Sequence, residues 1–242
     1  MKCLSRQDIE AIAARVVNAY IRLPELQGKP LYRIEPERLL QNVLGLNIDY
    51  HHLSMDNSVL GLTSVTALGV EVYENDDTPI IYYLDGKTVL IEDDLRTDTT
   101  QHGRCNFTIA HEGSHQIFKM LYPREYGGNA QSPKVHFYRV NSEKNKPISD
   151  WEEWQANALA SAILLPKDLV MQGMYLFSLG EKIKMLNKVY APRVYEQFKG
   201  LAEFLGVSKT ALAIRMKQFG LIEQDYLDNP YRLTDVLCDG GV

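Results

Sequence analysis

The spacing of hydrophobic residues predicts two helices in the N-terminal part of the chain. Ser5 and Asp8 have the spacing of a capping box, and apolar residues then recur every three or four positions until Pro24. A second helix is predicted from Pro36 to Gly45, because proline favours the first turn of a helix and glycine favours the position after its end. We interpret both helices as scaffold.

Between residues 46 and 95 the pattern changes from helical spacing to short runs of β-branched and aromatic residues. The runs cover residues 70–73, 80–84 and 88–91. Asp85 and Gly86 separate the last two runs, and Asp-Gly between apolar runs predicts a β-hairpin. A further strand is predicted within residues 134–140. The sequence therefore predicts a small β-sheet. Scaffold is the preferred interpretation of any one strand, and an edge that binds an extended peptide is the alternative.

A helix over residues 107–121 carries the clearest chemical motif of the chain. Asn106 is a suitable N-cap for this helix, and Pro123 follows its last turn. His111 and His115 are four residues apart, so their side chains project from one face of the helix, one turn apart. Two imidazoles in this arrangement can bind one zinc ion.

Glu112 stands between the two histidines. A zinc ion bound in this way keeps one coordination position open, and Glu112 lies near enough to that position to take a proton from a water molecule. The alternative is a helix that carries two histidines without binding metal. The amphipathic character of the helix favours the metal site, which then needs a third protein ligand.

The best candidates for the third ligand are Glu152 and Glu153, at the start of a second predicted helix over residues 150–165. The rest of this helix is apolar nearly all round and rich in alanine, so it is expected to be buried. One explanation of the two acids is a capping box, with Asp150 as N-cap and Glu153 at the third helical position. Periodicity does not decide whether Glu153 is a cap or a metal ligand. It also does not decide which of the two glutamates would bind the metal.

The two motif helices together resemble the ImmA/IrrE family of metallo-endopeptidases. The matching residues are Phe107-Thr108-Ile109-Ala110-His111-Glu112, His115, Glu153, Ala156, Asn157, Ala160 and Leu164-Leu165-Pro166. The chain departs from the family at Gly113-Ser114, where a bulky apolar residue followed by glycine is more common. It also departs at Leu159 and Leu165, where Phe and Met are more common. Glycine in mid-helix costs about 1 kcal/mol relative to alanine, but no departure removes a ligand.

The resemblance implies a zinc-dependent endopeptidase. It makes His111, His115 and Glu153 the zinc ligands, Glu112 the general base, and Asn157 a residue that steadies a ligand side chain. Mn2+ or Fe2+ can bind the same ligand set. The resemblance also implies an anti-repressor role, in which the enzyme cuts a helix-turn-helix transcriptional repressor at a specific site. The alternative is a metal-bound regulatory or DNA-binding protein without peptidase turnover.

Peptide hydrolysis also needs a hydrogen-bond donor aimed at the developing oxyanion. Suitable groups between the two motif helices are Tyr126, His136, Tyr138 and Arg139. None of these residues matches a family motif, so an ordinary packed or solvated role is the preferred interpretation for each. We interpret His51 and His52 as surface residues of a loop.

Helical spacing continues after Pro166, and two helices are predicted on either side of Gly206 and Ser208. Two helices joined by a short turn resemble a helix-turn-helix DNA reader. A helical hairpin that closes the peptidase core is the preferred interpretation, because these helices carry few basic residues and the net charge of the chain is -5. Direct nucleic-acid binding is therefore not expected. Residues 222–242 are predicted to form a solvated acidic tail.

Length and composition fit one α+β domain with an appendage. The chain has 242 residues, 45% of them hydrophobic, which suffices for a full core. We place the zinc-peptidase domain with its small sheet at residues 1–180, and a helical extension with the acidic tail at residues 181–242. Three cysteines without a Cys-x-x-Cys pair fit a reducing cytoplasm. Without a signal-peptide pattern or an apolar stretch of roughly 20 residues, a cytoplasmic protein outside the membrane is expected.

Overall fold

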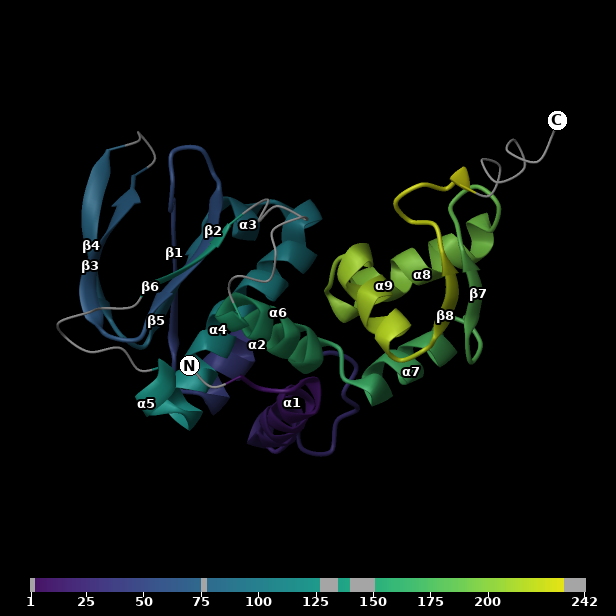
Figure 1. Ribbon diagram of the computed structural model, residues 1–242, viewed down its shortest axis with the longest axis horizontal. Helices are drawn as coiled ribbons and strands as arrows, with labels where there is room; N and C mark the ends of the chain where they lie inside the picture. The colour runs from purple at the N-terminus through teal and green to yellow at the C-terminus, as the bar shows by residue number, and fades with distance from the viewer. Residues whose placement is uncertain (1–2, 75–77, 127–134, 140–150, 233–242) are drawn as a thin grey trace. The chain divides into compact units, whose positions relative to one another are not determined.

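The computed structural model describes residues 3–74, 78–126, 135–139 and 151–232 (Figure 1). Its mixture of helices and small sheets confirms the predicted α+β class. The chain divides into two units, Met1–Leu164 and Leu165–Val242. This division falls before the boundary predicted near residue 180, because α7 (Lys167–Leu176) packs against α8 (Pro192–Leu205) within the second unit.

Both helices predicted near the N-terminus are present. Helix α1 (Arg6–Ile21) begins with the predicted capping box, in which the Asp8 amide donates to Ser5 Oγ at 3.2 Å and the Ser5 amide donates to Asp8 Oδ2 at 2.9 Å. The second helix is irregular, because α2 (Pro36–Arg38) continues directly into a π-helical turn, η2 (Leu39–Val43). Gly45, which was predicted to end this helix, has a φ of 64°, in the left-handed region that favours glycine.

A four-stranded sheet provides the scaffold of the first unit. Its strands, in spatial order, are β1 (Asn47–His51), β5 (Thr88–Glu92), β2 (Val59–Ser64) and β6 (Val135–Arg139). Strand β1 runs parallel to β5, whereas β2 runs antiparallel to both β5 and β6. Strands β3 (Ala67–Tyr73) and β4 (Pro79–Asp85) form a separate antiparallel pair. Within the described residues, β6 is an edge of the larger sheet.

The hairpin predicted at Asp85 and Gly86 is wrong. The two residues do form a turn, in which Gly86 has a φ of 78° and Asp85 Oδ1 accepts from the Lys87 amide at 2.7 Å and the Thr88 amide at 2.8 Å. However, this turn leads from β4 in one sheet to β5 in the other. All of β5 is buried, so this strand lies between β1 and β2 instead of pairing with β4, which is mostly exposed.

Helix α4 (His102–Leu121) connects the sheet to the second motif helix. It packs against β2, β5 and β6 and against α6 (Trp151–Leu164), which lies beside it in Figure 1. The shorter helical segments of the first unit are η1 (Pro24–Leu26), α3 (Asp94–Thr97), η3 (Thr99–Gln101) and α5 (Pro123–Tyr126). The first unit thus brings both motif segments to one place.

Helix α4 ends before Pro123, as predicted, but it begins earlier than predicted. Asn106 lies inside the helix and is not its N-cap. The reason is that the 3-10 turn η3 runs directly into α4, so the capping residue lies further upstream. Asp98 caps this turn, because its Oδ1 accepts from the Thr100 amide at 2.9 Å.

In its described residues, 165–232, the second unit has three helices and one pair of parallel strands. Besides α7 and α8 it contains α9 (Lys209–Gln218), β7 (Ile183–Leu186) and β8 (Ile222–Asp225). Gly206, with a φ of 70°, ends α8, and Ser208 caps α9, as predicted. A Cβ atom at Gly173 would lie 2.4 Å from Leu201 Cδ1, so glycine allows α7 and α8 to approach closely.

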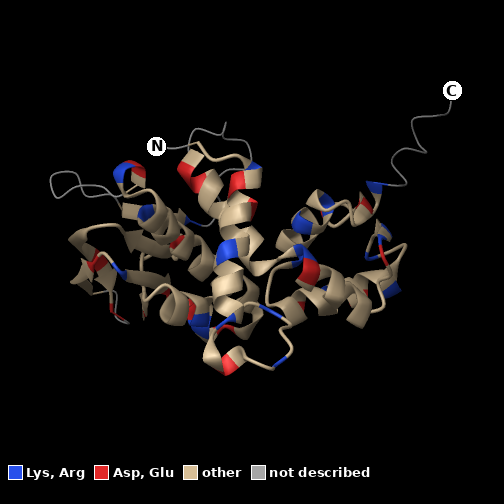
Figure 2. Cartoon of the chain, turned by 90° about the horizontal axis from the view of Figure 1, so that it is seen from below, with Lys and Arg blue, Asp and Glu red and all other residues tan. Residues whose placement is uncertain are grey.

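Strand β8 corrects the prediction of an acidic tail from residue 222. The acids of this strand pair with lysines, at 3.2 Å from Lys182 Nζ to Glu223 Oε1 and 3.2 Å from Lys217 Nζ to Asp225 Oδ2. Figure 2 shows acidic residues beside basic ones in this unit. These residues therefore belong to a folded element, while residues 233–242 lie outside the described chain.

Two further features of the chain are its cysteines and the length of its apolar helices. Cys3 and Cys105 are free thiols, and Cys238 lies outside the described residues. Among the described helices, none is long and apolar enough to cross a lipid bilayer.

Candidate metal centre

Three side chains from two helices converge in the first unit. His111 Nε2 lies 3.2 Å from His115 Nε2 and 3.1 Å from Glu153 Oε2, and His115 Nε2 lies 3.2 Å from Glu153 Oε1. Zinc bonds of about 2.05 Å in a tetrahedron would hold neighbouring ligand atoms about 3.3 Å apart. The two histidine nitrogens therefore have the spacing of neighbouring ligands in a tetrahedral site, and each lies at a similar distance from one oxygen of the same carboxylate, so this group could hold a metal ion.

The two helices present these ligands differently. Helix α4 carries the histidines one turn apart, and both are buried, with exposed fractions of 0% for His111 and 1% for His115. Glu153 projects from the first turn of α6, and 30% of its side chain is exposed. The glutamate is therefore the ligand that solvent reaches.

Two of the three ligands, His115 and Glu153, have pKa values shifted toward the protonation states that metal binding requires. Burial lowers the pKa of His115 to about 3, although contact with Glu153 raises it, so the imidazole stays neutral. Burial acts to raise the pKa of Glu153, but hydrogen bonds from His111, His115 and His136 outweigh it and hold this pKa below its usual value. Neutral imidazole and ionised carboxylate are the forms that bind metals.

Asn157 supports His111 on the far side of the ring from the other ligands. Its Oδ1 lies 3.2 Å from His111 Nδ1, so the amide oxygen accepts the proton of this nitrogen and turns Nε2 toward Glu153. Asn157 lies one turn after Glu153 on α6, which places both side chains on the same face of that helix. Its position agrees with the role that the family resemblance implies.

Glu112 is buried beside the three ligands. Neither of its carboxylate oxygens has a hydrogen bond of good geometry within the described residues. Burial raises the pKa of Glu112 well above its ordinary value, and the negative charge of Glu153 raises it further. The backbone amide of Tyr138 lowers this pKa, but by less than the other two causes raise it. Strand β2 approaches closely at Gly61, where a Cβ atom would lie 2.9 Å from Glu112 Cγ. A buried carboxyl of raised pKa is suited to proton transfer.

Two of the four candidate oxyanion donors lie at the centre. The ring centroid of Tyr138 is 4.4 Å from that of His111, and the ring of His136 stacks on His115 with centroids 3.8 Å apart. Both residues come from β6 and are two positions apart, so they share one face of the strand. The interpretation of both as ordinary packed residues missed this. Two-residue spacing on the predicted strand indicates that the two side chains share a face, but it does not indicate that this face lies at the centre.

The other two candidate donors are engaged elsewhere. Tyr126 stacks on Phe118 with ring centroids 5.2 Å apart, and its hydroxyl accepts from Gln155 Nε2 at 3.2 Å. Arg139 is exposed, and its guanidinium carbon lies 5.6 Å from the Phe137 ring centroid. Packing interactions account for both residues.

Glu152, the alternative third ligand, is buried with an exposed fraction of 5%. Its Oε1 lies 3.2 Å from His136 Nε2 and 3.9 Å from His115 Nδ1, and these residues form a second group that could hold a metal ion. However, the two imidazole rings are nearly parallel, at 19°, so their in-plane lone pairs do not converge on one point. The group that contains Glu153 is the better centre. Asp150, the proposed cap, lies outside the described residues.

The glycine that departs from the family pattern has a packing reason. A Cβ atom at Gly113 would lie 2.7 Å from Leu40 Cδ1 in η2, and Leu40 is itself buried. Glycine therefore lets the π-helical turn lie directly against α4. The departure concerns the packing of two elements and leaves the ligands unchanged.

His51 and His52 do not lie in a loop, contrary to prediction. His51 ends β1, and His52 forms an isolated β-bridge. His52 Nδ1 lies 2.8 Å from Glu92 Oε1, and Glu92 Oε2 accepts from the Leu53 amide at 2.8 Å. With Asp94 these residues form a third group capable of holding a metal. Because protein donors already satisfy Glu92, a structural hydrogen bond between His52 and Glu92 explains this cluster.

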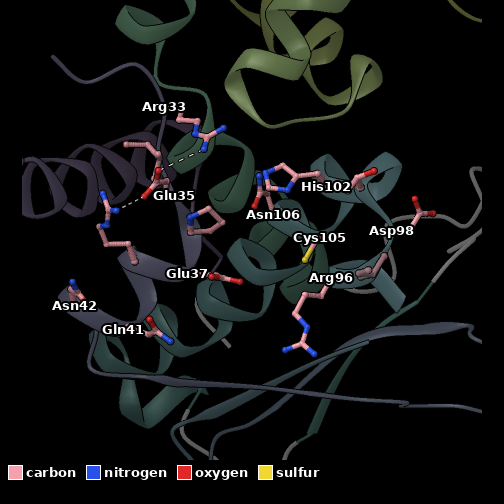
Figure 3. Close-up of a pocket in the computed structure, with 15 residues that line it drawn as sticks. Arg33, Glu35, Glu37, Gln41, Asn42, Arg96, Asp98, His102, Cys105 and Asn106 are labelled. Carbon is pink, nitrogen blue, oxygen red and sulfur yellow. Dashed lines mark ion pairs between the residues drawn. The ribbon is translucent and has the colours of Figure 1, made fainter. Parts of the chain in front are cut away.

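A cavity of about 680 Å³ lies between α2 and the start of α4 (Figure 3). Three of its charged side chains meet one another, with Arg38 at 2.9 Å and Arg33 at 3.7 Å from the carboxylate oxygens of Glu35. None of the three converging ligands lines it. The cavity is therefore separate from the candidate metal centre.

The residues of the centre carry the functional argument by themselves. No family model matches the chain, and no curated protein matches it either.

Proposed function

We propose that the chain is a zinc-dependent endopeptidase of the ImmA/IrrE kind. The observation that carries the proposal is the convergence of His111, His115 and Glu153 beside the buried carboxyl of Glu112. A structural zinc site is usually closed by a fourth protein ligand and needs no adjacent base. Among the described residues three could donate to a metal ion here, and the buried carboxyl of Glu112, the proposed base, lies next to them. The family resemblance points to the same residues.

Zinc fits the donor set. Two neutral imidazoles with one carboxylate are a known ligand set of catalytic zinc sites, and the donor spacing is close to that of a tetrahedron. When bound, zinc polarises a carbonyl oxygen and makes a coordinated water more acidic. Mn2+ and Fe2+ accept the same donors, so metal analysis of the purified protein has to identify the ion.

Glu112 serves as the general base and then as the general acid. Its carboxylate takes a proton from the attacking water, and the resulting carboxylic acid gives that proton to the leaving amine. Close approach of β2 at Gly61 limits the positions that the carboxyl can adopt.

Tyr138 is the better candidate for the donor to the oxyanion. Its half-buried ring lies against His111, whereas both nitrogens of His136 face carboxylates. His136 Nε2 lies 3.2 Å from Glu152 Oε1, and His136 Nδ1 lies 3.6 Å from Glu153 Oε1. A phenol hydroxyl near the reacting carbonyl can stabilise the charge that develops in the transition state.

The proposed substrate is a helix-turn-helix transcriptional repressor, and cleavage would lift repression in the cytoplasm. Only the family resemblance supports this choice of partner. Strand β6 carries Tyr138 and is an edge of the sheet in the described part of the chain, so its backbone groups offer an extended segment of the repressor a pairing partner.

A DNA-binding role for α8 and α9 is the alternative, favoured by their arrangement as two helices with a short turn. The basic residues of α9 argue against it. Arg215 is 3% exposed and donates to the Leu165 carbonyl at 3.1 Å, while Lys217 pairs with Asp225. A buried arginine cannot contact a DNA phosphate. Tight, sequence-specific DNA binding in a gel-shift titration at physiological salt would support the alternative.

Zinc content and peptide cleavage together test the proposal. Mass spectrometry of the wild type should find about one zinc per chain, and a fluorescence-quenched peptide library should be cleaved. Glu112→Gln should keep the zinc and lose about 10²-fold to 10⁴-fold in turnover, because it removes the base but no ligand. Glu153→Ala should lose the zinc itself.

Glu125→Gln is the matched control, because it neutralises an exposed carboxylate of the same unit. It should retain both zinc and turnover. Wild-type turnover in Glu112→Gln would contradict the mechanism. A wild type that lacks zinc and cannot be loaded with it would contradict the proposal as a whole.

A further inference from the structure

The carboxylate of Glu152 is enclosed next to the candidate metal centre. Burial of a carboxylate is costly unless donors meet it. Its Oε1 lies 3.2 Å from His136 Nε2 and 3.9 Å from His115 Nδ1, so two imidazoles from different elements face the same oxygen. Glu152 therefore lies next to two imidazole nitrogens, neither of which has a hydrogen bond of good geometry in the described part of the chain.

One nitrogen of the His115 ring, Nδ1, does not face the group formed by His111, His115 and Glu153. Its Nε2 faces Glu153 and His111, so Nδ1 points to the opposite side of the ring. This Nδ1 is buried and has no hydrogen bond of good geometry within the described residues. A histidine that binds metal through one nitrogen almost always donates from the other to a carboxylate or carbonyl. Asn157 serves His111 in this way, and Glu152 is placed to serve His115.

His136 spans the two neighbouring carboxylates. Its ring stacks on His115 with a centroid distance of 3.8 Å, while its Nδ1 lies 3.6 Å from Glu153 Oε1 and its Nε2 lies 3.2 Å from Glu152 Oε1. Strand β6 thereby contributes a side chain that covers one ligand and faces the carboxylate of another.

We propose that Glu152 and His136 are positioning residues of the metal centre. Glu152 orients His115 through Nδ1, and His136 holds the carboxylates of Glu152 and Glu153 apart across the face of the His115 ring. The inference rests on the proposed function only in that a metal ion binds to His111, His115 and Glu153. Groups that orient metal ligands typically contribute about 10-fold to 100-fold to metal affinity.

Zinc affinity, measured by competition with a chromophoric chelator, tests the inference. Glu152→Ala removes the acceptor, and His136→Phe keeps the stacked ring but removes both nitrogens. Each variant should bind zinc about 10-fold to 100-fold more weakly than the wild type, yet should still bind one equivalent when zinc is in excess. The double variant should lose less affinity than the product of the single losses, because both residues act through the same two ligands.

A spectroscopic measurement separates positioning from a general loss of structure. The visible absorption of Co2+ bound in place of zinc reports the geometry of the ligands and should change in both variants. If Glu152→Ala loses the circular dichroism of the wild type, Glu152→Gln keeps the size of the side chain and should weaken zinc binding about tenfold. Glu196→Ala and His102→Phe change exposed residues of the same types and should leave zinc affinity unchanged.

The possible results separate this inference from the proposed function. One zinc bound with wild-type affinity in both Glu152→Ala and His136→Phe would overturn the inference alone. Two zinc ions in the wild type, one of which is lost in each variant, would overturn it in favour of a second cation site at His115, His136 and Glu152. A wild type that binds no zinc would overturn both the proposed function and the inference.

Discussion

Gly61 occupies a position in β2 where a larger residue does not fit beside Glu112. A Cβ atom there would lie 2.6 Å from Thr108 Cγ2 and 2.9 Å from Glu112 Cγ. The register of β2 against β6 also shifts between Val59 and Gly61. The backbone of the strand therefore helps to fix where the carboxyl of Glu112 lies, without touching a metal ligand.

Gly61→Ala is expected to lower peptide turnover by about 10²-fold while zinc content stays at the wild-type level. The added methyl group displaces the carboxyl of Glu112 but no ligand, and a shift of about 1 Å in a reacting group can cost that much. Zinc and turnover are measured on the same preparation. Gly69→Ala is the control, since its Cβ would meet Ile81 Cγ2 at 2.9 Å, in an exposed side chain that can move. Wild-type turnover in Gly61→Ala would contradict this placement of Glu112.

At this scale the sequence identifies the histidine pair and its glutamate, but periodicity cannot rank Glu152 against Glu153, and only the family resemblance selects Glu153. Neighbouring helix residues point about 100° apart, and the orientation of α6 decides which glutamate meets the histidines. The structure brings Glu153 to both Nε2 atoms and Glu152 to the opposite side of His115. His136 comes from a strand between the motif helices, so only the pairing of β6 with β2 reveals its position.

Features set by local signals were predicted, but the pairing of strands with distant partners was not. The capping box of α1 involves residues three apart, and the turn at Asp85 and Gly86 is set by its own hydrogen bonds. The pairing of β5 depends instead on burial of the whole strand between β1 and β2. The same holds for β8, whose parallel partner β7 lies far away in the sequence.

The contact between η2 and α4 leads to a prediction about packing. In an isolated helix, Gly113→Ala would be stabilising by about 1 kcal/mol. Here the new Cβ would lie 2.7 Å from Leu40 Cδ1, and Leu40 is buried and cannot turn away into solvent. We expect the substitution to lower the free energy of unfolding by about 1–3 kcal/mol, as measured by urea denaturation.

Leu40→Ala provides the test of this cause. In the Leu40→Ala variant the clash is absent, so Gly113→Ala should lower the free energy of unfolding by less than it does in the wild type. The difference between the two losses is the coupling energy of Leu40 and Gly113. Equal costs in both backgrounds would show that the effect of Gly113→Ala arises elsewhere. A more stable Gly113→Ala in the otherwise native chain would contradict the packing argument.

The whole molecule consists of two units, each with buried apolar residues of its own. In the second unit Phe198, Leu201, Leu212 and Met216 are completely buried. All three converging ligands belong to the first unit. A ligand stabilises only the part of a protein whose unfolding releases it, so zinc should distinguish the two units.

Zinc is expected to slow amide hydrogen exchange in the first unit and to leave the second unit unchanged. At a free concentration of 100 times its dissociation constant, a ligand adds about 2.7 kcal/mol to the stability of the state that binds it, which slows exchange through unfolding about 100-fold. The slowing should appear in α4, β6 and the first turn of α6, whereas α8 and α9 should exchange as they do without zinc. Glu153→Ala should show no effect of zinc in either unit. Equal slowing in α8 and α9 would mean that the two units unfold as one cooperative block. Slowing confined to segments other than α4 would place the metal away from His111 and His115.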